Sequence, residues 1–277
     1  MIQKFIRGLP MLLGSMIVTF AFILYVNFFM IKIFLLLLFY KLYNFLHFRW
    51  IFAIRLEQVN PIFPYISDLG LHQPVLSMFT FSLCFASLLL LLVVVIRYRL
   101  TRYYLDIYNM DLRWANYSLA TGMIMVVSMC ATGSIQNDKP FYLQILHNIF
   151  ATILFTSVQF DILTEFLIAR QLPNQTRISN GRIIILIISM TAVILYLLTM
   201  IISFQKYPQS FANSSLRLWW STNDPGYYWH VASSIFEWFI VIMLGPHVMT
   251  YRSLFETDII NLDEKQKCTN HNNNDGN

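Results

Sequence analysis

Five ionisable side chains lie inside long apolar stretches of this sequence: His147, Asp161, Glu165, His230 and Glu237. A titratable group inside a membrane is energetically expensive and is a functional candidate by default. His230 and Glu237 are seven residues apart, so on a helix they share one face at a separation of about 10 Å. A polar site built around them could hold a lipid headgroup, a proton or a metal ion.

Two residues could complete this site. His147 would lie opposite His230 and Glu237 if their segments pack together, and Asp68 would close the group from the mouth of an earlier apolar stretch. The alternative is that these side chains form interhelical hydrogen bonds that fix the packing. We favour that alternative, because metal chemistry normally needs three converging ligands and the chain has no HxxxH or HExxH motif. We therefore expect neither a catalytic residue nor a metal ligand.

The remaining two acids, Asp161 and Glu165, are four residues apart and are closely followed by Arg170. Like charges at this spacing on a helix repel each other unless a cation lies nearby. We therefore expect both carboxylates at a solvated helix end, near the cytoplasmic interface.

The composition indicates that these groups belong to a membrane protein. Of the 277 residues, 57% are hydrophobic and 12% are charged, and the mean hydropathy is +0.57. A soluble domain is about a quarter charged, so an ordinary soluble enzyme is excluded. The net charge of +5 is explained by cytoplasmic loops that face anionic lipid, and no nucleic-acid partner is expected.

Intervals free of Asp, Glu, Lys and Arg predict the helices that carry these residues, because about 20 helical residues cross the hydrocarbon layer. Five such intervals occur, at residues 8–31, 69–96, 114–137, 140–160 and 183–205. A sixth, at 227–249, is interrupted only by Glu237 and begins in an aromatic cluster typical of a membrane interface. We predict an all-α, polytopic membrane protein with six transmembrane helices.

The distribution of basic residues orients the predicted bundle. With both termini cytoplasmic, twelve Lys and Arg residues fall on the inner side and four on the outer side, in agreement with the positive-inside rule. Arg97 and Arg182 count as inner loop residues, and Arg217 counts as an outer one. The loops 55–74 and 206–229 then face outward, and Asn213 is the expected glycosylation site.

Two segments do not fit a simple six-span pattern. Residues 26–50 are strongly apolar but include Lys32, Lys41 and Arg49. We interpret them as an insertion or an over-long first helix whose basic side chains extend to the interface. The transmembrane domain is expected over residues 1–251, and the polar residues 252–277 are predicted to form a disordered cytoplasmic tail.

Short motifs follow one another in a fixed order over residues 55–255. They include Pro64, Tyr65, Ile66, Ser67, Asp68 and Gly70 in the first loop, and Gly226, Tyr227, His230, Glu237 and Trp238 at the sixth span. Together they resemble the signature of the DNA-damage-regulated autophagy modulator (DRAM) family, within the Frag/DRAM/Sfk group of six-span membrane proteins.

This resemblance implies a non-enzymatic, multi-pass protein that promotes autophagy at lysosomal or endosomal membranes. It implies no cofactor, and the expected partners are membrane lipids and unidentified membrane or cytosolic proteins. Protonation of His147 and His230 in an acidic lumen could bias the conformation. The alternatives are a plasma-membrane regulator of phosphoinositide organisation, a metal-dependent lipid-modifying enzyme using Asp68, His147, His230 and Glu237, and a proton-coupled transporter centred on Glu237.

Overall fold

A computed structural model of the chain describes residues 47–62, 64–135, 141–173 and 175–274, and within these ranges it contains helices and no strand. The all-α prediction is confirmed for this part of the chain. Residues 47–55 are helical. The later elements are η1 (Asp68–Gly70), α2 (Val75–Ile107), α3 (Arg113–Ser134), α4 (Phe141–Gln171), α5 (Thr176–Lys206), α6 (Pro208–Ala212), α7 (Ser214–Leu218) and α8 (Tyr227–Asn274).

Five helices are long and apolar enough to cross a membrane: α2, α3, α4, α5 and the Tyr227–Tyr251 part of α8. They correspond to the second to sixth predicted spans. The shortest has 22 residues, which gives about 33 Å of helix against the roughly 30 Å of hydrocarbon to be crossed. The predicted first span, 8–31, lies outside the described residues, so the six-span topology and the cytoplasmic termini stay predictions.

Several of these helices extend beyond the charge-free intervals that predicted them, among them α4, which continues past Phe160 to Gln171. Helix α2 continues past Ile96 to Ile107, and α5 begins at Thr176 instead of Ile183. Arg97 and Arg182 therefore lie within helices, and both are fully buried. Their assignment to cytoplasmic loops is wrong, because a boundary drawn at the first charged residue cannot distinguish a loop arginine from one paired inside the bundle.

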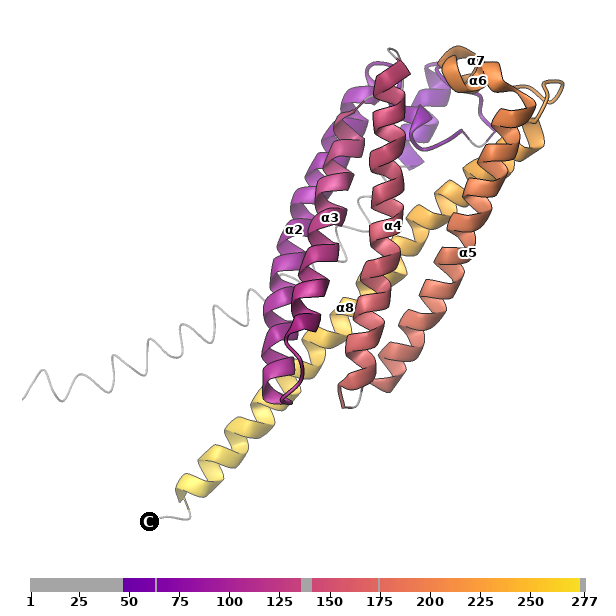
Figure 1. Cartoon of the computed structure of the whole chain (residues 1–277). Helices are drawn as coiled ribbons and strands as arrows, with labels where there is room; N and C mark the ends of the chain where they lie inside the picture. The colour runs from indigo at the N-terminus through magenta and orange to yellow at the C-terminus, as the bar shows by residue number, and fades with distance from the viewer. Residues whose placement is uncertain (1–46, 63, 136–140, 174, 275–277) are drawn as a thin grey trace, which may run out of the picture. The chain divides into compact units, whose positions relative to one another are not determined.

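Consecutive long helices pack side by side: α2 against α3, α3 against α4, and α4 against α5. Short connections join α2 to α3 and α4 to α5 at one end of the bundle, which we call the turn end (Figure 1). The longer segments before α2 and between α5 and α8 lie at the opposite end, the loop end (Figure 1). An apolar core lies between α2, α3 and α4, formed by Ala86, Leu90, Val94, Met125, Val126, Met129, Leu154, Val158 and Ile162.

The two predicted outer loops meet at the loop end. The Asn60 N–H donates to the Leu218 carbonyl at 3.0 Å, and Asn60 Nδ2 donates to the Trp220 carbonyl at 3.1 Å. The two loops therefore lie at the same end of the bundle, and their outward orientation stays a prediction. Asn213 caps α7, where its Oδ1 accepts a 3.1 Å hydrogen bond from the Ser215 N–H. Its glycosylation stays a prediction.

The helical residues 47–55 pack onto an apolar cluster at the loop end. Ala53 is fully buried there with Leu69 and Phe79, and Trp50 packs against the same cluster. Arg49 is also fully buried, with its guanidinium carbon 4.5 Å from the Phe79 ring centroid, in a cation–π contact. The expectation that Arg49 extends to the interface is therefore wrong. The predictions for residues 26–46, Lys32 and Lys41 included, lie outside the described residues.

The chain divides into two compact units, one of Tyr40–Tyr251 and one of Met1–Phe39 with Arg252–Asn277. The buried polar clusters of the bundle lie within Tyr40–Tyr251. In the other unit, the structure describes only the continuation of α8 to Asn274. The predicted disorder of residues 252–277 stays a prediction.

Candidate functional site

Buried polar side chains from α2, α3, α4, α5 and α8 meet toward the turn end. We call this group the turn-end network. Asp161 of α4 is at its centre and accepts two hydrogen bonds of 2.8 Å from the Arg97 guanidinium of α2. Such charge-assisted, two-point contacts are among the strongest hydrogen bonds in proteins. The members of the network are Arg97, Ser118, Thr121, Asp161, Glu165, Arg182, His247, Thr250 and Tyr251.

Asp161 has further partners on two other helices. The Tyr251 hydroxyl donates to it at 2.5 Å, and the Thr121 hydroxyl of α3 donates at 3.0 Å. His247 Nε2 lies 3.0 Å from the same carboxylate, and Arg97 also donates to the Tyr251 hydroxyl. A buried carboxylate needs such a full set of donors to offset its lost hydration.

Glu165, one turn further along α4, is held by arginines of two helices. Its carboxylate lies 3.5 Å from Arg97 Nε and 3.4 Å from Arg182 Nη2. It also accepts a 2.7 Å hydrogen bond from Ser118 Oγ, and Arg182 Nη1 donates at 2.7 Å to the Glu165 carbonyl. Two arginines thus balance two carboxylates, and this balance reduces the cost of burying the charges.

The expectation that Asp161 and Glu165 lie at a solvated helix end is wrong, because both side chains are fully buried. Their mutual repulsion is relieved by Arg97 and Arg182, which come from other helices. One sequence signal points to this arrangement: both arginines directly border apolar intervals, at the same predicted side of the membrane as the two acids. His247 was missed as well, although it precedes Tyr251 by one helical turn and therefore shares its face.

A second buried ion pair lies at the loop end. Asp68 of η1 accepts hydrogen bonds of 2.8 and 3.0 Å from Arg217 Nε, and Arg217 Nη2 lies 2.8 Å from the same carboxylate. Both side chains are almost completely buried. The pair joins the first loop to α7 across 149 residues of sequence. Arg217 therefore acts as a structural partner inside the protein instead of as an outer surface charge.

Residues 64–70, which we call the signature segment, are fastened to α8 through main-chain hydrogen bonds. Glu237 Oε2 accepts a 2.7 Å hydrogen bond from the Ile66 N–H. Trp238 Nε1 donates a 2.9 Å hydrogen bond to the Pro64 carbonyl. Loop backbone that is buried must find partners of this kind, because water cannot reach it. Glu237 and Trp238 thus fix the path of the signature segment.

His230 contacts the signature segment through its ring. The ring centroid lies 4.8 Å from that of Tyr65, edge to face, and 4.5 Å from that of Trp220, with which it stacks. The Tyr65 hydroxyl is hydrogen-bonded to Ser233 on the same face of α8 as His230. Burial raises the pKa of Tyr65, so this hydroxyl stays protonated and able to donate.

His147 connects α4 to the end of α3. It is buried, and its Nδ1 lies 2.7 Å from the Ile135 carbonyl, directly after the last residue of α3. Carbonyls at a helix end lack intrahelical partners and need a donor from elsewhere. All four predicted site residues, Asp68, His147, His230 and Glu237, thus lie at the loop end. Among the described residues, no three His, Cys, Asp or Glu side chains are grouped as metal ligands would be.

Two glycines of the family signature are required by close approaches. A Cβ atom at Gly70 would lie 2.8 Å from atoms of the Phe79 ring. Gly226 has a φ of +79°, and a Cβ there would lie 2.9 Å from the Ser203 carbonyl oxygen. Only glycine adopts such a conformation without strain. Gly226 therefore allows the chain to turn tightly against α5 before Tyr227 begins α8.

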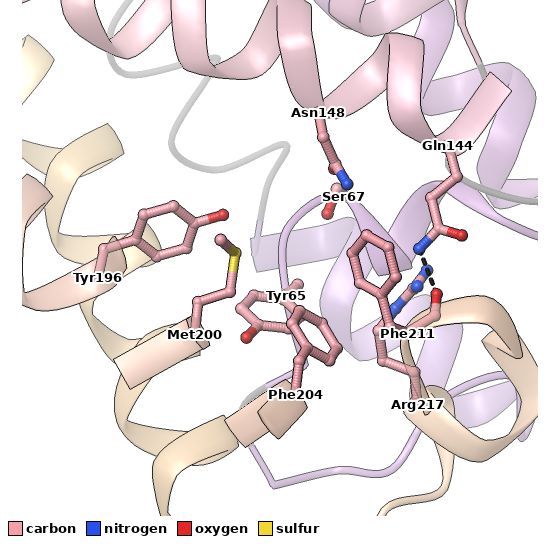
Figure 2. Close-up of a pocket in the computed structure, with 9 residues that line it drawn as sticks. All are labelled: Tyr65, Ser67, Gln144, Asn148, Tyr196, Met200, Phe204, Phe211 and Arg217. Carbon is pink, nitrogen blue, oxygen red and sulfur yellow. Dashed lines mark hydrogen bonds between the residues drawn. The ribbon is translucent and has the colours of Figure 1, made fainter. Parts of the chain in front are cut away.

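A small cavity of about 20 Å³ lies beside the signature segment (Figure 2). This volume is enough for about one water molecule. Its lining combines polar and apolar side chains from the signature segment, α4, α5, α6 and α7: Tyr65, Ser67, Gln144, Asn148, Tyr196, Met200, Phe204, Phe211 and Arg217. At its edge, Gln144 Nε2 donates a 2.6 Å hydrogen bond to the Phe211 carbonyl. This bond connects α6 to α4.

Comparison with known proteins identifies relatives over most of the chain. It is 26% identical over 208 residues to DNA damage-regulated autophagy modulator protein 1 of Xenopus laevis, covering 74% of this chain and 82% of the relative. It is 24% identical over 205 residues to DNA damage-regulated autophagy modulator protein 2 of Rattus norvegicus, covering 74% and 76%.

The human DNA damage-regulated autophagy modulator protein 1 is 23% identical over 219 residues, covering 75% of this chain and 84% of the relative. No solved structure matches the chain. Residues 16–253 match the family described as the Frag1/DRAM/Sfk1/Cwh43P N-terminal domain. This match covers the signature segment, both buried ion-pair clusters and all five candidate spans. The chain is therefore a multi-pass membrane protein that belongs to the Frag1/DRAM/Sfk1 family.

Proposed function

We propose that this protein is a non-enzymatic modulator of autophagy in lysosomal or endosomal membranes, where it organises lipids or partner proteins. The observation that carries the proposal is the family match over residues 16–253, together with relatives that are named as autophagy modulators. The alignments cover three quarters or more of each relative quoted above, so the similarity extends over most of those proteins.

The geometry supports an organising role because its ionisable groups join segments of the protein. Asp161 and Glu165 connect α4 to arginines of α2 and α5, and Asp68 connects η1 to α7. These charges hold the bundle in one arrangement, so that its lipid-facing and loop surfaces are presented in a fixed way. An organising protein of this kind acts through the lipids or partner proteins that bind to these surfaces.

The loop-end residues Asp68, His147, His230 and Glu237 are proposed to form a lumen-facing polar site that responds to acidity. Both histidine rings are buried, and burial opposes their charged form, so protonation in an acidic lumen would have to admit water to them and would thereby bias the conformation of the signature segment. Purified protein in nanodiscs is expected to change its tryptophan fluorescence between pH 7 and pH 5, since Trp220 stacks on His230. An unchanged spectrum in this range would remove the pH-responsive part of the proposal.

A cellular experiment tests the autophagy role itself. A tagged copy is expected on lysosomal or endosomal membranes, and loss of the protein is expected to lower autophagic flux. Re-expression of the wild-type chain should restore the flux, as should the surface variant Asp111→Asn, whose carboxylate is exposed. Normal flux in cells that lack the protein would contradict the proposed function.

A further inference from the structure

A lateral groove of about 240 Å³ opens between α4 and α5, in the half of the bundle nearer the loop end. Figure 1 shows these two helices spreading apart in this direction. The walls of the groove are mainly apolar and include Ala151, Phe155, Val193, Leu197 and Met200. The same two membrane-spanning helices carry exposed apolar side chains, such as Ile149 and Ile194. The groove therefore faces the acyl chains of the bilayer.

The size of the groove matches a segment of one lipid acyl chain. It runs along α4 from Asn148 to Thr156, a separation of eight residues that corresponds to about 12 Å of helix. Its volume exceeds the roughly 150 Å³ of an engineered cavity that binds benzene, and it is smaller than the about 300 to 1,000 Å³ of sites for drug-sized ligands. One acyl segment fits this space, whereas a complete two-chain lipid does not.

Two polar groups lie at the end of the groove nearer the loop end. The Asn148 amide and the Tyr196 hydroxyl line both the groove and the small cavity beside it, and Figure 2 shows both side chains directed toward the cavity. Neither group is hydrogen-bonded to another described residue. Polar groups at this depth normally find a partner, because the bilayer interior supplies none. A polar atom of a bound molecule would meet this need.

The depth of these groups agrees with the level of lipid ester linkages. Helix α4 has 31 residues, about 46 Å, against a membrane of about 40 to 45 Å with its headgroup regions. Asn148 lies seven residues from the first residue of α4, or about 10 Å from that end. This is the boundary between headgroups and hydrocarbon.

The charge of the site disfavours a phosphate or a carboxylate. Arg217 is the only basic residue among those that line the small cavity, and its guanidinium is bound by Asp68 in a buried ion pair. The cavity itself has room for about one water molecule only. An uncharged carbonyl can accept hydrogen bonds from Asn148 and Tyr196, whereas an anion would remain without a compensating charge.

We propose that the groove between α4 and α5 binds one acyl chain of a membrane glycerolipid, whose uncharged ester linkage is held by Asn148 and Tyr196. Lipid binding at this site deepens the proposed organising role. The binding itself does not depend on that role, but its purpose in the cell does. The site is distinct from the four predicted residues Asp68, His147, His230 and Glu237, because none of them lines the groove.

Photo-crosslinking of the full chain in nanodiscs tests the site. The probe is phosphatidylcholine with a diazirine in one acyl chain, and labelled positions are mapped by mass spectrometry. Labelling is expected to concentrate at the residues of α4 and α5 that line the groove, which are Ala151, Thr152, Phe155, Thr156, Val193 and Leu197. Asn148→Leu should lower it about five-fold, the effect of one lost hydrogen bond, and Ala151→Leu should lower it by filling the groove. The control Ile149→Trp, at an exposed position on the same helix, should leave it unchanged.

Competition identifies the chemistry at the polar end. Unlabelled monooleoylglycerol, which carries an uncharged ester, should reduce the labelling, whereas oleate should not. Labelling spread evenly over Ile149, Ile194 and the groove would overturn the proposal, as would equal competition by oleate. If Ala151→Leu does not fold, Thr152→Leu fills the same groove. The assay contains no cellular readout, so its failure leaves the autophagy proposal standing, and normal autophagic flux in cells without the protein leaves the lipid site standing.

Discussion

The turn-end network and the Asp68–Arg217 pair both bury charge, but they differ in what they connect. In the turn-end network, Arg97, Asp161, Glu165 and Arg182 all lie within long helices. At the loop end, Asp68 lies in the three-residue η1 and Arg217 in the five-residue α7. Charges on long helices fix how those helices pack, whereas charges on short segments fix the path of a loop.

This difference leads to different consequences when a charge is removed. A guanidinium on α2 has no route to water without separating the helices, so its burial is enforced by the whole bundle. Arg217 lies in an irregular region that can open locally while the long helices stay packed. We therefore expect global destabilisation from the turn-end network and local opening from the loop-end pair.

The largest effect is expected from Asp161→Leu. It leaves the Arg97 guanidinium buried without its main partner, and breaking a buried pair in this way costs about 3 to 5 kcal/mol. Unfolding of the purified protein in detergent, followed by denaturant titration or by heating, measures the loss. The double variant Arg97→Leu/Asp161→Leu should recover much of it, because neither charge remains. A double variant less stable than Asp161→Leu would contradict this account.

A smaller and more local effect is expected from Asp68→Leu. The loss of charge-assisted hydrogen bonds to Arg217 costs about 1.5 to 3 kcal/mol, moderated by the ability of α7 to open toward water. Hydrogen exchange should accelerate in residues 208–226 while the exchange of α2 and α3 stays unchanged. Uniform acceleration over the bundle would show that the two clusters do not differ in the way described here.

Two variants of Glu237 distinguish the contribution of its charge from that of its hydrogen bond to the stability of the signature segment. Glu237→Gln retains a side-chain oxygen that can accept from the Ile66 N–H, so we expect a loss of at most about 1 kcal/mol. Glu237→Leu has no acceptor and should destabilise the signature segment more. Protease accessibility of residues 56–74 is the measurement. Equal behaviour of the two variants would exclude the main-chain hydrogen bond as the role of Glu237.

The smallest effect is expected from Asp111→Asn at the turn end, where Asp111 and Arg113 form an exposed ion pair of 2.6 Å. Hydrogen bonds from Arg113 lower the pKa of Asp111. The pair therefore stabilises the fold above the unfolded pKa of about 3.9 and loses this contribution as the pH falls through the lower folded value. At neutral pH the melting temperature should match the wild type, because exposed pairs contribute little. A clear decrease in the melting temperature would mean that this exposed pair stabilises the fold as much as the buried ion pairs do.

The sequence predicts the positions of the helices better than it predicts which side chains pair between them. Charge-free stretches identify α2, α3, α4, α5 and α8, because the bilayer demands about 20 apolar residues per crossing. The apolar sequence of each span does not say which helices are neighbours, so the pairing of Arg97 with Asp161 was missed. Asp68 and Glu237 stand out in the sequence, but their partners are an arginine in the short helix α7 and a main-chain N–H, which no local pattern reveals.

The turn-end network also sets an order for the synthesis of the protein. Arg97 is translated 64 residues before Asp161, which at about 5 to 20 residues per second is an interval of about 3 to 13 s. During this time α2 and α3 enter the membrane with an arginine that has no carboxylate partner, and Tyr251 arrives later still. The network is therefore completed only after the last span has been made, because α8 supplies the His247 and Tyr251 side chains that bind Asp161.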